Sequence, residues 1–499
     1  MEDRPVLLIT PPSPFLLDER VFLSLGILKV AAVLERDGYQ VELLDLSGIS
    51  NYEEVCEIQA KKTTAQFVGI TVTTPQLPAA ARIAERIRAV RPDLKIIVGG
   101  PHPTLVNAAV KLEKKNGRIG RAHKALDRLH EIFDVIVAGD GESSIFEALK
   151  PNAPKLIDAD DPKGTLFMTN AAYEESPRPA RHLVDVDSYK YQIDGHPATT
   201  LIAQLGCSFG CLFCGGRNSN MLRRIRTRST KSVVDEIEYL HQTYGYTGFN
   251  FFDDELNLNR EMIGLMNSIS DLQSRLGVDF RLRGFVKSQL FTEEQAEAMY
   301  RAGFRWILCG FESASERILR NMNKRATVED NTKVVEVSRK YGLKVKALMS
   351  VGHAGETEES ILSVRDWLIK VAPDDFDCTV ISCFPGAPYY DEAIPHETLP
   401  DVWTFTDKKS GDRLHSYDID YSTTADYYKG DPNDGYKSFV FTDTLSPDDI
   451  VRLRNQVEDE VRAKLQIPFN PGKPGQLFEH SMGQGTLPSN IFRASLASE

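Results

Sequence analysis

GCSFGCLFCGGR, at residues 206–217, carries three cysteines within eight residues, Cys207, Cys211 and Cys214, in the spacing CxxxCxxC. The stretch follows a predicted strand, so a loop that wraps around one metal centre would bring the thiols together. Soft thiolates select zinc or iron–sulfur clusters. Structural zinc normally takes a fourth protein ligand, and the local sequence offers no His or second CxxC. We therefore expect a four-iron four-sulfur cluster with one open iron, with zinc or an incidental cysteine group as the alternatives.

The cysteines stand at the start of a series of strands and helices. Each of the first five predicted strands is followed by a helix, for example 231–244, 260–276 and 293–302. The strands are predicted at residues 200–205, 248–252, 279–284, 305–310, 344–350 and 377–381. Six such units fall short of the eight of a closed barrel, so we expect a partial (βα)6 barrel of TIM type.

A second alternating series precedes the cysteines. Its strands are predicted at residues 6–10, 41–44, 68–72, 95–98 and 135–138, with helices starting near Ser24, Tyr52, Pro78 and Thr104 and one more after Ser143. This pattern is typical of a doubly wound, Rossmann-like sheet. The basic stretch 111–130 is longer than a normal crossover, and we interpret it as an insertion.

The fold class is therefore α/β, in four parts. We expect a Rossmann-like domain at 1–150, a linker rich in Pro and Asp at 151–195, the partial barrel at 196–392, and a small, mostly irregular or helical region at 393–499. One clear helix is predicted at 447–464, with Ser446 as its N-cap. The tail at 467–493 is expected to form an ordered strap over the barrel.

Composition excludes several classes of protein. The chain has 499 residues, enough for about three domains of roughly 150 residues each. Its formal net charge of −12 argues against general nucleic-acid binding. No apolar run approaches the ~20 residues of a membrane span, and the first residues, MEDRPVLLIT, do not resemble a signal peptide. Seven sparse cysteines fit a reducing compartment, so we expect a cytoplasmic protein.

The cysteine stretch resembles the cluster loop of the radical S-adenosylmethionine (SAM) superfamily, with Phe213 at the aromatic position before the third cysteine. In that family the three cysteines hold a four-iron four-sulfur cluster, the open iron binds SAM, and reductive cleavage of SAM gives a 5′-deoxyadenosyl radical. The resemblance implies an external one-electron reductant of the flavodoxin or ferredoxin type.

Later segments extend this resemblance. FFDDELN at 251–257 offers Asp253 and Asp254 for the amino group of SAM, and RLRGFVKS at 281–288 offers Arg283 for its carboxylate. The alternatives are helix capping by the aspartates and a surface salt bridge for Arg283.

Two further motifs are similar to a cobalamin-associated branch of the superfamily. GFESASERILRNMNK at 310–324 implies that Glu312 contacts the ribose of SAM. SVGHAGETEES at 350–360 makes His353 a weak candidate for a general acid or base, with a solvated loop histidine as the alternative.

The first domain resembles the cobalamin-binding domain of the same branch, on the loops TTPQL at 73–77 and GGPHPT at 99–104. No GxGxxG follows the first strand, so a dinucleotide is not expected. The DxHxxG motif, whose histidine ligates cobalt, is absent, because the first loop reads Asp18-Glu19-Arg20. We therefore expect a lower face of cobalamin without a histidine ligand, facing Thr74 to Gln76. The predicted cobalamin-site residues are Thr73, Thr74, Gln76, Gly99, Gly100, His102, Gly139, Gly141 and Glu142, with His102 fixing a loop or a propionamide.

The C-terminal region matches no motif of known chemistry. His480, within FEHSMGQG beside Glu479 and Met482, is a weak candidate for a substrate site. The leading hypothesis is a cobalamin-dependent radical SAM methyltransferase that methylates an unactivated carbon of a small molecule. The alternatives are a rearrangement, cyclisation or ring contraction without methylation, and a non-catalytic cobalamin sensor or carrier. A methylthiolating transfer-RNA enzyme would want a second cysteine triad in the N-terminal domain, which holds only Cys56.

Overall fold

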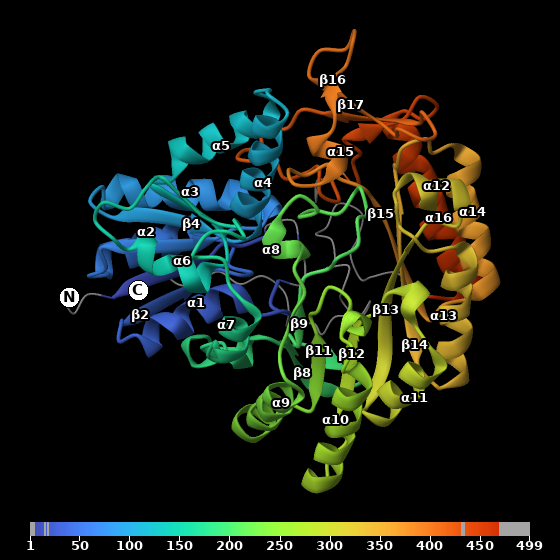
Figure 1. Cartoon of the computed structure of the whole chain (residues 1–499), viewed down its shortest axis with the longest axis horizontal. Helices are drawn as coiled ribbons and strands as arrows, with labels where there is room; N and C mark the ends of the chain where they lie inside the picture. Colours follow the sequence, from blue (N-terminus) through green and yellow to red (C-terminus); the bar gives the residue numbers. More distant parts are fainter. Residues whose placement is uncertain (1–4, 14–15, 17–18, 431–434, 469–499) are drawn as a thin grey trace.

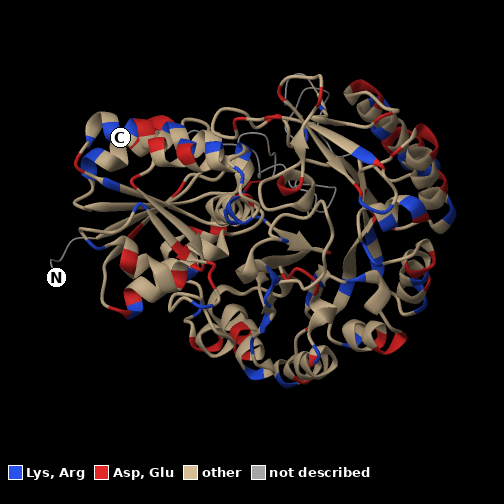
Figure 2. Cartoon of the chain, turned by 45° about the horizontal axis from the view of Figure 1, so that its top comes forward, with Lys and Arg blue, Asp and Glu red and all other residues tan. Residues whose placement is uncertain are grey.

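Two α/β units lie side by side, and a C-terminal segment packs across both (Figure 1). The structure is a computed structural model that describes residues 5–13, 16, 19–430 and 435–468. Within these residues no helix is long and apolar enough to cross a membrane. Charged residues gather on the outer helices of both units, whereas the strands carry few of them (Figure 2).

The N-terminal sheet has six parallel strands in the order β2-β1-β3-β4-β5-β6. Strand β1 lies inside this sheet, and its side chains enter two different cores. Val6 and Leu8 enter one core and Leu7 and Ile9 the other, because successive strand residues point to opposite faces. Helices α1 and α6 cover one face, and α2 to α5 cover the other. The elements are β1 (Val6–Thr10), α1 (Leu25–Arg36), β2 (Val41–Asp45), α2 (Tyr52–Lys62), β3 (Phe67–Thr71), α3 (Leu77–Val90), β4 (Lys95–Gly99), α4 (Pro101–Lys115), α5 (Arg121–Ile132), β5 (Val135–Gly139), α6 (Gly141–Ala148) and β6 (Leu156–Ala159).

This confirms the predicted doubly wound sheet, with two differences. Strand β6 lies within the segment predicted as a linker, which also contains α7 (Asn170–Glu175). Strand β6, LIDA, lies in a Pro- and Asp-rich stretch and includes an aspartate, so it does not stand out as a buried apolar run. The predicted insertion at 111–130 is the end of α4 followed by most of α5, separated by a break near Gly117, whose φ is +66°.

The second sheet is the predicted partial barrel, with strand order β15-β14-β13-β12-β11-β8-β7. Six of its strands run parallel, and β7 pairs antiparallel with β8 at the open edge. The predicted first strand is divided into β8 and β9, and β9 pairs with β10. The strands are β7 (Gln192–Ile193), β8 (His196–Leu201), β9 (Gln204–Leu205), β10 (Arg226–Thr227), β11 (Gly248–Phe251), β12 (Arg281–Phe285), β13 (Phe304–Glu312), β14 (Lys344–Val351) and β15 (Asp375–Val380).

Helices cover the outside of the curved sheet (Figure 1). Each is amphipathic, and its apolar stripe packs on the strands. Several begin at a side-chain N-cap, as Ser229 does for α9 by accepting a hydrogen bond from the Ser232 amide. They are α9 (Thr230–Tyr244), α10 (Met262–Leu276), α11 (Glu293–Arg301), α13 (Val328–Lys340) and α14 (Glu358–Val371). Two short helices differ: α8 (Asn220–Arg223) has no buried residue, and α12 (Glu316–Asn321) packs in a small separate cluster.

The C-terminal region contains a sheet that the sequence did not predict. Four short antiparallel strands, in the order β16-β17-β18-β19, follow the short helix α15 (Pro388–Asp391). The strands are β16 (Ile394–Pro395), β17 (Val402–Thr406), β18 (Arg413–Tyr417) and β19 (Val440–Phe441). The predicted last helix is α16 (Pro447–Leu465), with a capping box between Ser446 and Asp449. His480, Glu479, Met482 and almost all of the predicted strap lie outside the described residues.

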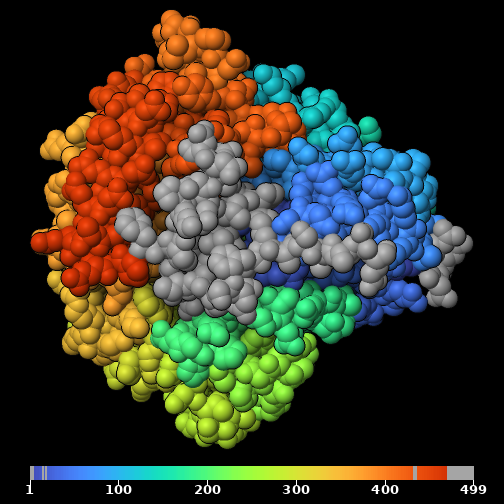
Figure 3. Space-filling model, turned by 180° about the vertical axis from the view of Figure 1, so that it is seen from behind, coloured from blue at the N-terminus to red at the C-terminus, as the bar shows by residue number. Residues whose placement is uncertain are grey.

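Buried polar contacts join the parts. Arg226 forms two hydrogen bonds of 2.8 Å with Asp140, which follows β5. The carboxylate of Asp160 accepts hydrogen bonds from the Ser219 hydroxyl and the Met221 amide of the barrel domain. The guanidinium of Arg121 on α5 stacks 3.6 Å from the centre of the Tyr390 ring. Figure 3 shows C-terminal residues, in orange, against the N-terminal domain, in blue and cyan.

A buried carboxylate on α9 should make the protein sensitive to acid. Glu236 is bound by Arg181 at 2.7 Å and Arg228 at 2.6 Å, and despite its burial these cations lower its pKa to about 2, from an ordinary value of 4.5. Because the folded pKa is depressed, this stabilisation, on the order of 3 kcal/mol, is present above pH 4.5 and is lost as the pH falls through about 2. We expect Glu236→Gln to lower the free energy of unfolding at pH 7 by a similar amount and to flatten its acid dependence.

Urea denaturation between pH 2 and pH 7 measures this effect. Glu238→Gln is the matched control, because Glu238 lies on the same helix and pairs with Arg275 at the surface, where ion pairs contribute little. Equal stability of the Glu236→Gln variant and the wild type would contradict the prediction.

Candidate functional site

The cysteine loop is held in shape by its own backbone. Gly206 has φ +87°, and a Cβ there would lie 2.1 Å from the carbonyl oxygen of Arg224, so only glycine fits. The buried guanidinium of Arg217 donates to the carbonyl oxygens of Cys207 at 2.6 Å and Phe209 at 2.7 Å. These contacts fold residues 206–217 into a closed turn.

The three predicted ligand thiols are brought together inside this turn. Cys207 and Cys211 are buried, and Cys214 is partly accessible. Burial raises the pKa of Cys214 to about 12; the charge of Arg217 opposes this shift, and Cys211 and Cys207 add to it. Sulfur atoms that influence one another in this way, beside a cation that favours thiolates, suit a multi-iron cluster. Among the described residues, no group of three or more Cys, His, Asp or Glu side chains is placed to hold a single metal ion.

Neighbouring elements fix the loop from outside. The amide of Leu212 donates to the carbonyl oxygen of Met322 at 2.9 Å, and the Tyr389 amide donates to the carbonyl oxygen of Leu212 at 3.0 Å. Asn323 Nδ2 donates to the carbonyl oxygen of Gly210 at 2.8 Å. The cysteines are therefore tied to both the α12 end and α15.

The two predicted aspartates differ in their roles. Asp253 is buried and accepts a hydrogen bond from the Ala203 amide at 3.1 Å, and burial raises its pKa to about 7. Asp254 is exposed and accepts a hydrogen bond from the Gly206 amide at 2.9 Å. The surrounding protein limits the solvation of its carboxylate and so raises its pKa. Asp254 is therefore the carboxylate that a ligand can reach, while Asp253 supports the chain before the cysteine loop.

Sequence reasoning missed a third acid in the same run. Burial raises the pKa of Glu255 to about 7, and the charges of Lys324 and Lys287 oppose that shift. Glu255 belongs to the motif FFDDELN, but a run of three acids does not reveal which side chain faces the barrel interior.

Arg283 lies within β12 and not at its end, and it is 2% exposed. Lys287 follows that strand, is equally buried, and has its Nζ 4.7 Å from the centre of the Phe209 ring. A cation beside the cysteine loop is thus supplied by Lys287, which the sequence did not single out.

Glu312, at the end of β13, belongs to a buried network. Lys324 Nζ donates to its Oε1 at 2.9 Å and Ser350 Oγ donates to its Oε2 at 2.7 Å. These contacts, chiefly the charge of Lys324, hold its pKa below the ordinary value despite burial. Its φ of +66° is uncommon for a residue with a side chain.

His353 completes the network, with Nε2 2.8 Å from Ser350 Oγ. The predicted alternative of a solvated histidine is wrong, because the side chain is fully buried and burial lowers its pKa to about 4. A ring that stays neutral and inaccessible near pH 7 is poorly suited to exchange protons with a substrate.

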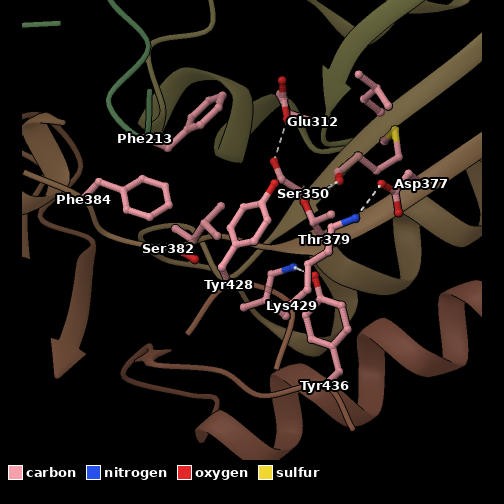
Figure 4. Close-up of a pocket in the computed structure, with 14 residues that line it drawn as sticks. Phe213, Glu312, Ser350, Asp377, Thr379, Ser382, Phe384, Tyr428, Lys429 and Tyr436 are labelled. Atoms are coloured by element: carbon pink, nitrogen blue, oxygen red, sulfur yellow. Dashed lines mark hydrogen bonds and ion pairs between the residues drawn. The ribbon is translucent and has the colours of Figure 1, made fainter. Parts of the chain in front are cut away.

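Glu312 and Ser350 line a cavity of about 240 Å³ (Figure 4). Aromatic rings of Phe213, Phe384 and Tyr428 line one part, and Asp377 and Lys429 another. The cavity therefore opens from the cysteine loop toward the C-terminal region.

The predicted cobalamin loops lie at the carboxyl edge of the N-terminal sheet. Thr73 and Gln76 form a capping box, and Gln76 Nε2 donates to the carbonyl oxygen of Pro11 at 2.9 Å. Gly100 has φ +99°, and a Cβ there would lie 2.9 Å from the Val72 nitrogen. Gly99, the last residue of β4, leads into this turn.

His102 is 1% exposed, its Nδ1 lies 3.1 Å from Thr74 Oγ1, and its ring packs beside Tyr421. Burial lowers its pKa to about 3. The side chain is thus engaged in holding the loop that carries Thr74.

The predicted cobalamin-site residues that follow β5 pack against neighbouring elements. Gly139 has φ +105°, and a Cβ there would lie 2.5 Å from the carbonyl carbon of Ala159 in β6. Gly141 begins α6, and Glu142 lines a hollow between α1 and α6. Asp140, which the sequence did not select, is the residue of this loop that reaches the barrel domain through Arg226.

The cobalamin-loop edge of the N-terminal sheet and the cysteine loop of the barrel meet at Leu105 on α4. A Cβ on Gly215 of the cysteine loop would lie 3.5 Å from Leu105 Cδ1, and one on Gly386 2.9 Å from Leu105 Cδ2. The cysteine loop is thus in contact with the helix that follows the Gly99–Gly100 turn.

Two family descriptions match the chain: the radical SAM superfamily over residues 201–368 and the B12 binding domain over residues 20–130. The chain is a radical SAM protein with a B12-binding domain. A radical SAM domain implies SAM and a four-iron four-sulfur cluster, and a B12-binding domain implies cobalamin. The cysteine turn and the loops at the edge of the N-terminal sheet provide fitting donors. The chain is therefore a cobalamin-dependent radical SAM enzyme.

Known proteins are similar to this chain in sequence or in fold. The chain is 26% identical over 411 residues to an uncharacterized methyltransferase of Pyrococcus horikoshii, which covers 79% of this chain and 84% of that one. It is 26% identical over 360 residues to the anaerobic magnesium-protoporphyrin IX monomethyl ester cyclase of Rubrivivax gelatinosus. That match covers 68% of this chain and 61% of the cyclase. The structure of the radical SAM methyltransferase TsrM from Kitasatospora setae, with cobalamin and a cluster bound, has a TM-score of 0.63 at 18% identity, over 93% and 89% of the chains.

Alanine at Cys207, Cys211 or Cys214 is expected to abolish the cluster, because each thiolate would ligate one iron. Iron and sulfide contents after anaerobic reconstitution measure this. Cys56→Ala is the control, since Cys56 is a buried core thiol of α2. A triad variant with the full iron content of the wild type would contradict the assignment.

The electron paramagnetic resonance (EPR) spectrum of cob(II)alamin in the protein should lack nitrogen coupling from an axial histidine, because His102 is buried against Thr74 and Tyr421. His102→Asn should give the same axial spectrum. Nitrogen coupling that is present in the wild type and disappears in this variant would show that His102 is a cobalt ligand.

Proposed function

We propose that this enzyme transfers a methyl group from SAM through cobalamin to an unactivated carbon of a small-molecule substrate. The contact of Leu105 with Gly215 and Gly386 carries the proposal, because it joins the N-terminal sheet edge to the cysteine loop. Methyl transfer between two cofactor sites requires a shared space from which water is excluded.

When bound, the cluster with SAM supplies radical chemistry and cobalamin carries the methyl group. Cys207, Cys211 and Cys214 would hold the cluster, with Arg217 keeping their loop closed. Glu312, fixed by Lys324 and Ser350, would accept hydrogen bonds from the ribose hydroxyls of SAM.

Charged groups near the loop have complementary tasks. Asp254, accessible beside Gly206, would accept hydrogen bonds from the amino group of SAM. Lys287, beside Phe209, would face its carboxylate in place of the predicted Arg283. Thr74 would lie under the lower face of cobalamin, with His102 holding it in position.

An external one-electron reductant, of the flavodoxin or ferredoxin type, belongs to this proposal because the cluster must be reduced before SAM can be cleaved. A second candidate function is a cyclisation or rearrangement without methyl transfer. The match to the Rubrivivax gelatinosus cyclase favours it, because that relative is similar to the chain over 68% of the length of the chain.

Product analysis separates the two functions. The protein would be reconstituted anaerobically with iron, sulfide and cobalamin, then incubated with SAM and a strong reductant. We expect both 5′-deoxyadenosine and S-adenosylhomocysteine by mass spectrometry, with cobalamin retained through gel filtration.

Deoxyadenosine without S-adenosylhomocysteine would favour the reaction without methylation. Cys207→Ala is the control and should give no deoxyadenosine. If wild-type protein with a full cluster forms neither product, the result would contradict the proposal and favour a cobalamin sensor or carrier.

A further inference from the structure

The hydrogen atoms of the buried hydrogen-bond network formed by Glu312, Ser350 and His353 can be assigned. Ser350 Oγ lies 2.7 Å from Glu312 Oε2 and 2.8 Å from His353 Nε2, but a hydroxyl has only one proton to donate. Glu312 is ionised, since the ammonium of Lys324 beside it lowers its pKa. An ionised carboxylate only accepts, so the proton of Ser350 points to Glu312. His353 Nε2 must then carry a hydrogen and donate it to Ser350.

The other ring nitrogen of His353 is then an unprotonated acceptor, because the ring is neutral. Nδ1 is buried and has no hydrogen-bond partner among the described residues. Burying an unpaired polar atom costs stability, so a side chain that served packing alone would more economically be apolar. The arrangement indicates that the Nε2–H donor is what His353 contributes at this position.

The same ring also packs against the cysteine loop. The ring centres of His353 and Phe213 are 5.2 Å apart with the planes at 74°, an edge-to-face contact. Phe213 precedes Cys214 and lines the cavity with Glu312 and Ser350 (Figure 4). His353 itself lies behind this wall, where it cannot touch a ligand directly.

We propose that His353 is a positioning residue: its Nε2–H tautomer orients the Ser350 hydroxyl and thereby fixes the Glu312 carboxylate in the rotamer that recognises a vicinal diol. Lys324 holds one carboxylate oxygen and Ser350 the other, so the plane of the carboxylate is set and its remaining lone pairs can receive two adjacent hydroxyl groups. This inference rests on the proposed use of SAM, whose ribose supplies such a diol.

The test measures binding, so it does not depend on turnover. Reconstituted protein with its cluster and cobalamin would be titrated anaerobically, by equilibrium dialysis, with S-adenosylhomocysteine and with its 2′-deoxyribose analogue. The wild type should bind the diol-bearing compound at least about tenfold more tightly, the effect of a hydrogen bond to a charged group.

Two variants separate positioning from packing. His353→Gln can place an amide N–H near the position of Nε2, and it should keep the preference for the diol to within about threefold. His353→Leu fills similar space without a donor, and it should bind both compounds about equally, with the S-adenosylhomocysteine affinity reduced about tenfold. His182→Leu, at an exposed histidine, is the control and should match the wild type.

Retention of the full preference in His353→Leu would overturn the inference, and so would equal loss of it in the leucine and glutamine variants. Failure of methyl transfer with an intact preference would count against the proposed function alone. Cluster and cobalamin contents of each variant establish that the protein is folded.

Discussion

The guanidinium of Arg217 is the group on which the site depends. A loop of twelve residues that encloses a cluster turns its backbone inward, where the carbonyl groups cannot reach water. Arg217 satisfies two of these carbonyls, at Cys207 and Phe209, and its charge favours the thiolates that burial disfavours. Gly206 permits the reversal that starts the loop. The loop is therefore ordered by the protein itself, which is what a cluster with one open iron requires.

Around this loop the two domains are joined by buried polar and apolar contacts. Asp140 with Arg226, and Asp160 with Ser219 and Met221, connect the edge of the N-terminal sheet to the start of the barrel. Leu105 provides the apolar contact with the cysteine loop itself. Because a buried ion pair loses much of its value when its geometry changes, these contacts favour one relative placement of the domains. A fixed placement is what two cofactors sharing a cavity need.

Much of this could be predicted from the sequence because it depends on local pattern. Buried parallel strands are short apolar runs, and CxxxCxxC with its flanking glycines is a dense local signal. Strand β6 and the sheet β16–β19 could not be predicted, because their sequences, such as LIDA and RLHSY, mix polar and apolar residues and form no continuous apolar run. The contrast between Asp253 and Asp254 depends on which neighbour faces the interior, and the pairing of Asp140 with Arg226 joins residues 86 positions apart. Neither is a property of any local stretch of sequence.

The proposed function requires the cluster and cobalamin sites to lie close together, and EPR spectroscopy tests this most directly. Spectra would be recorded of reconstituted protein with cob(II)alamin alone, with the reduced cluster alone, and with both. We expect the cob(II)alamin signal to broaden and relax faster when the cluster is also paramagnetic, because the two spins are close. A spectrum that is the unperturbed sum of the separate signals would contradict it.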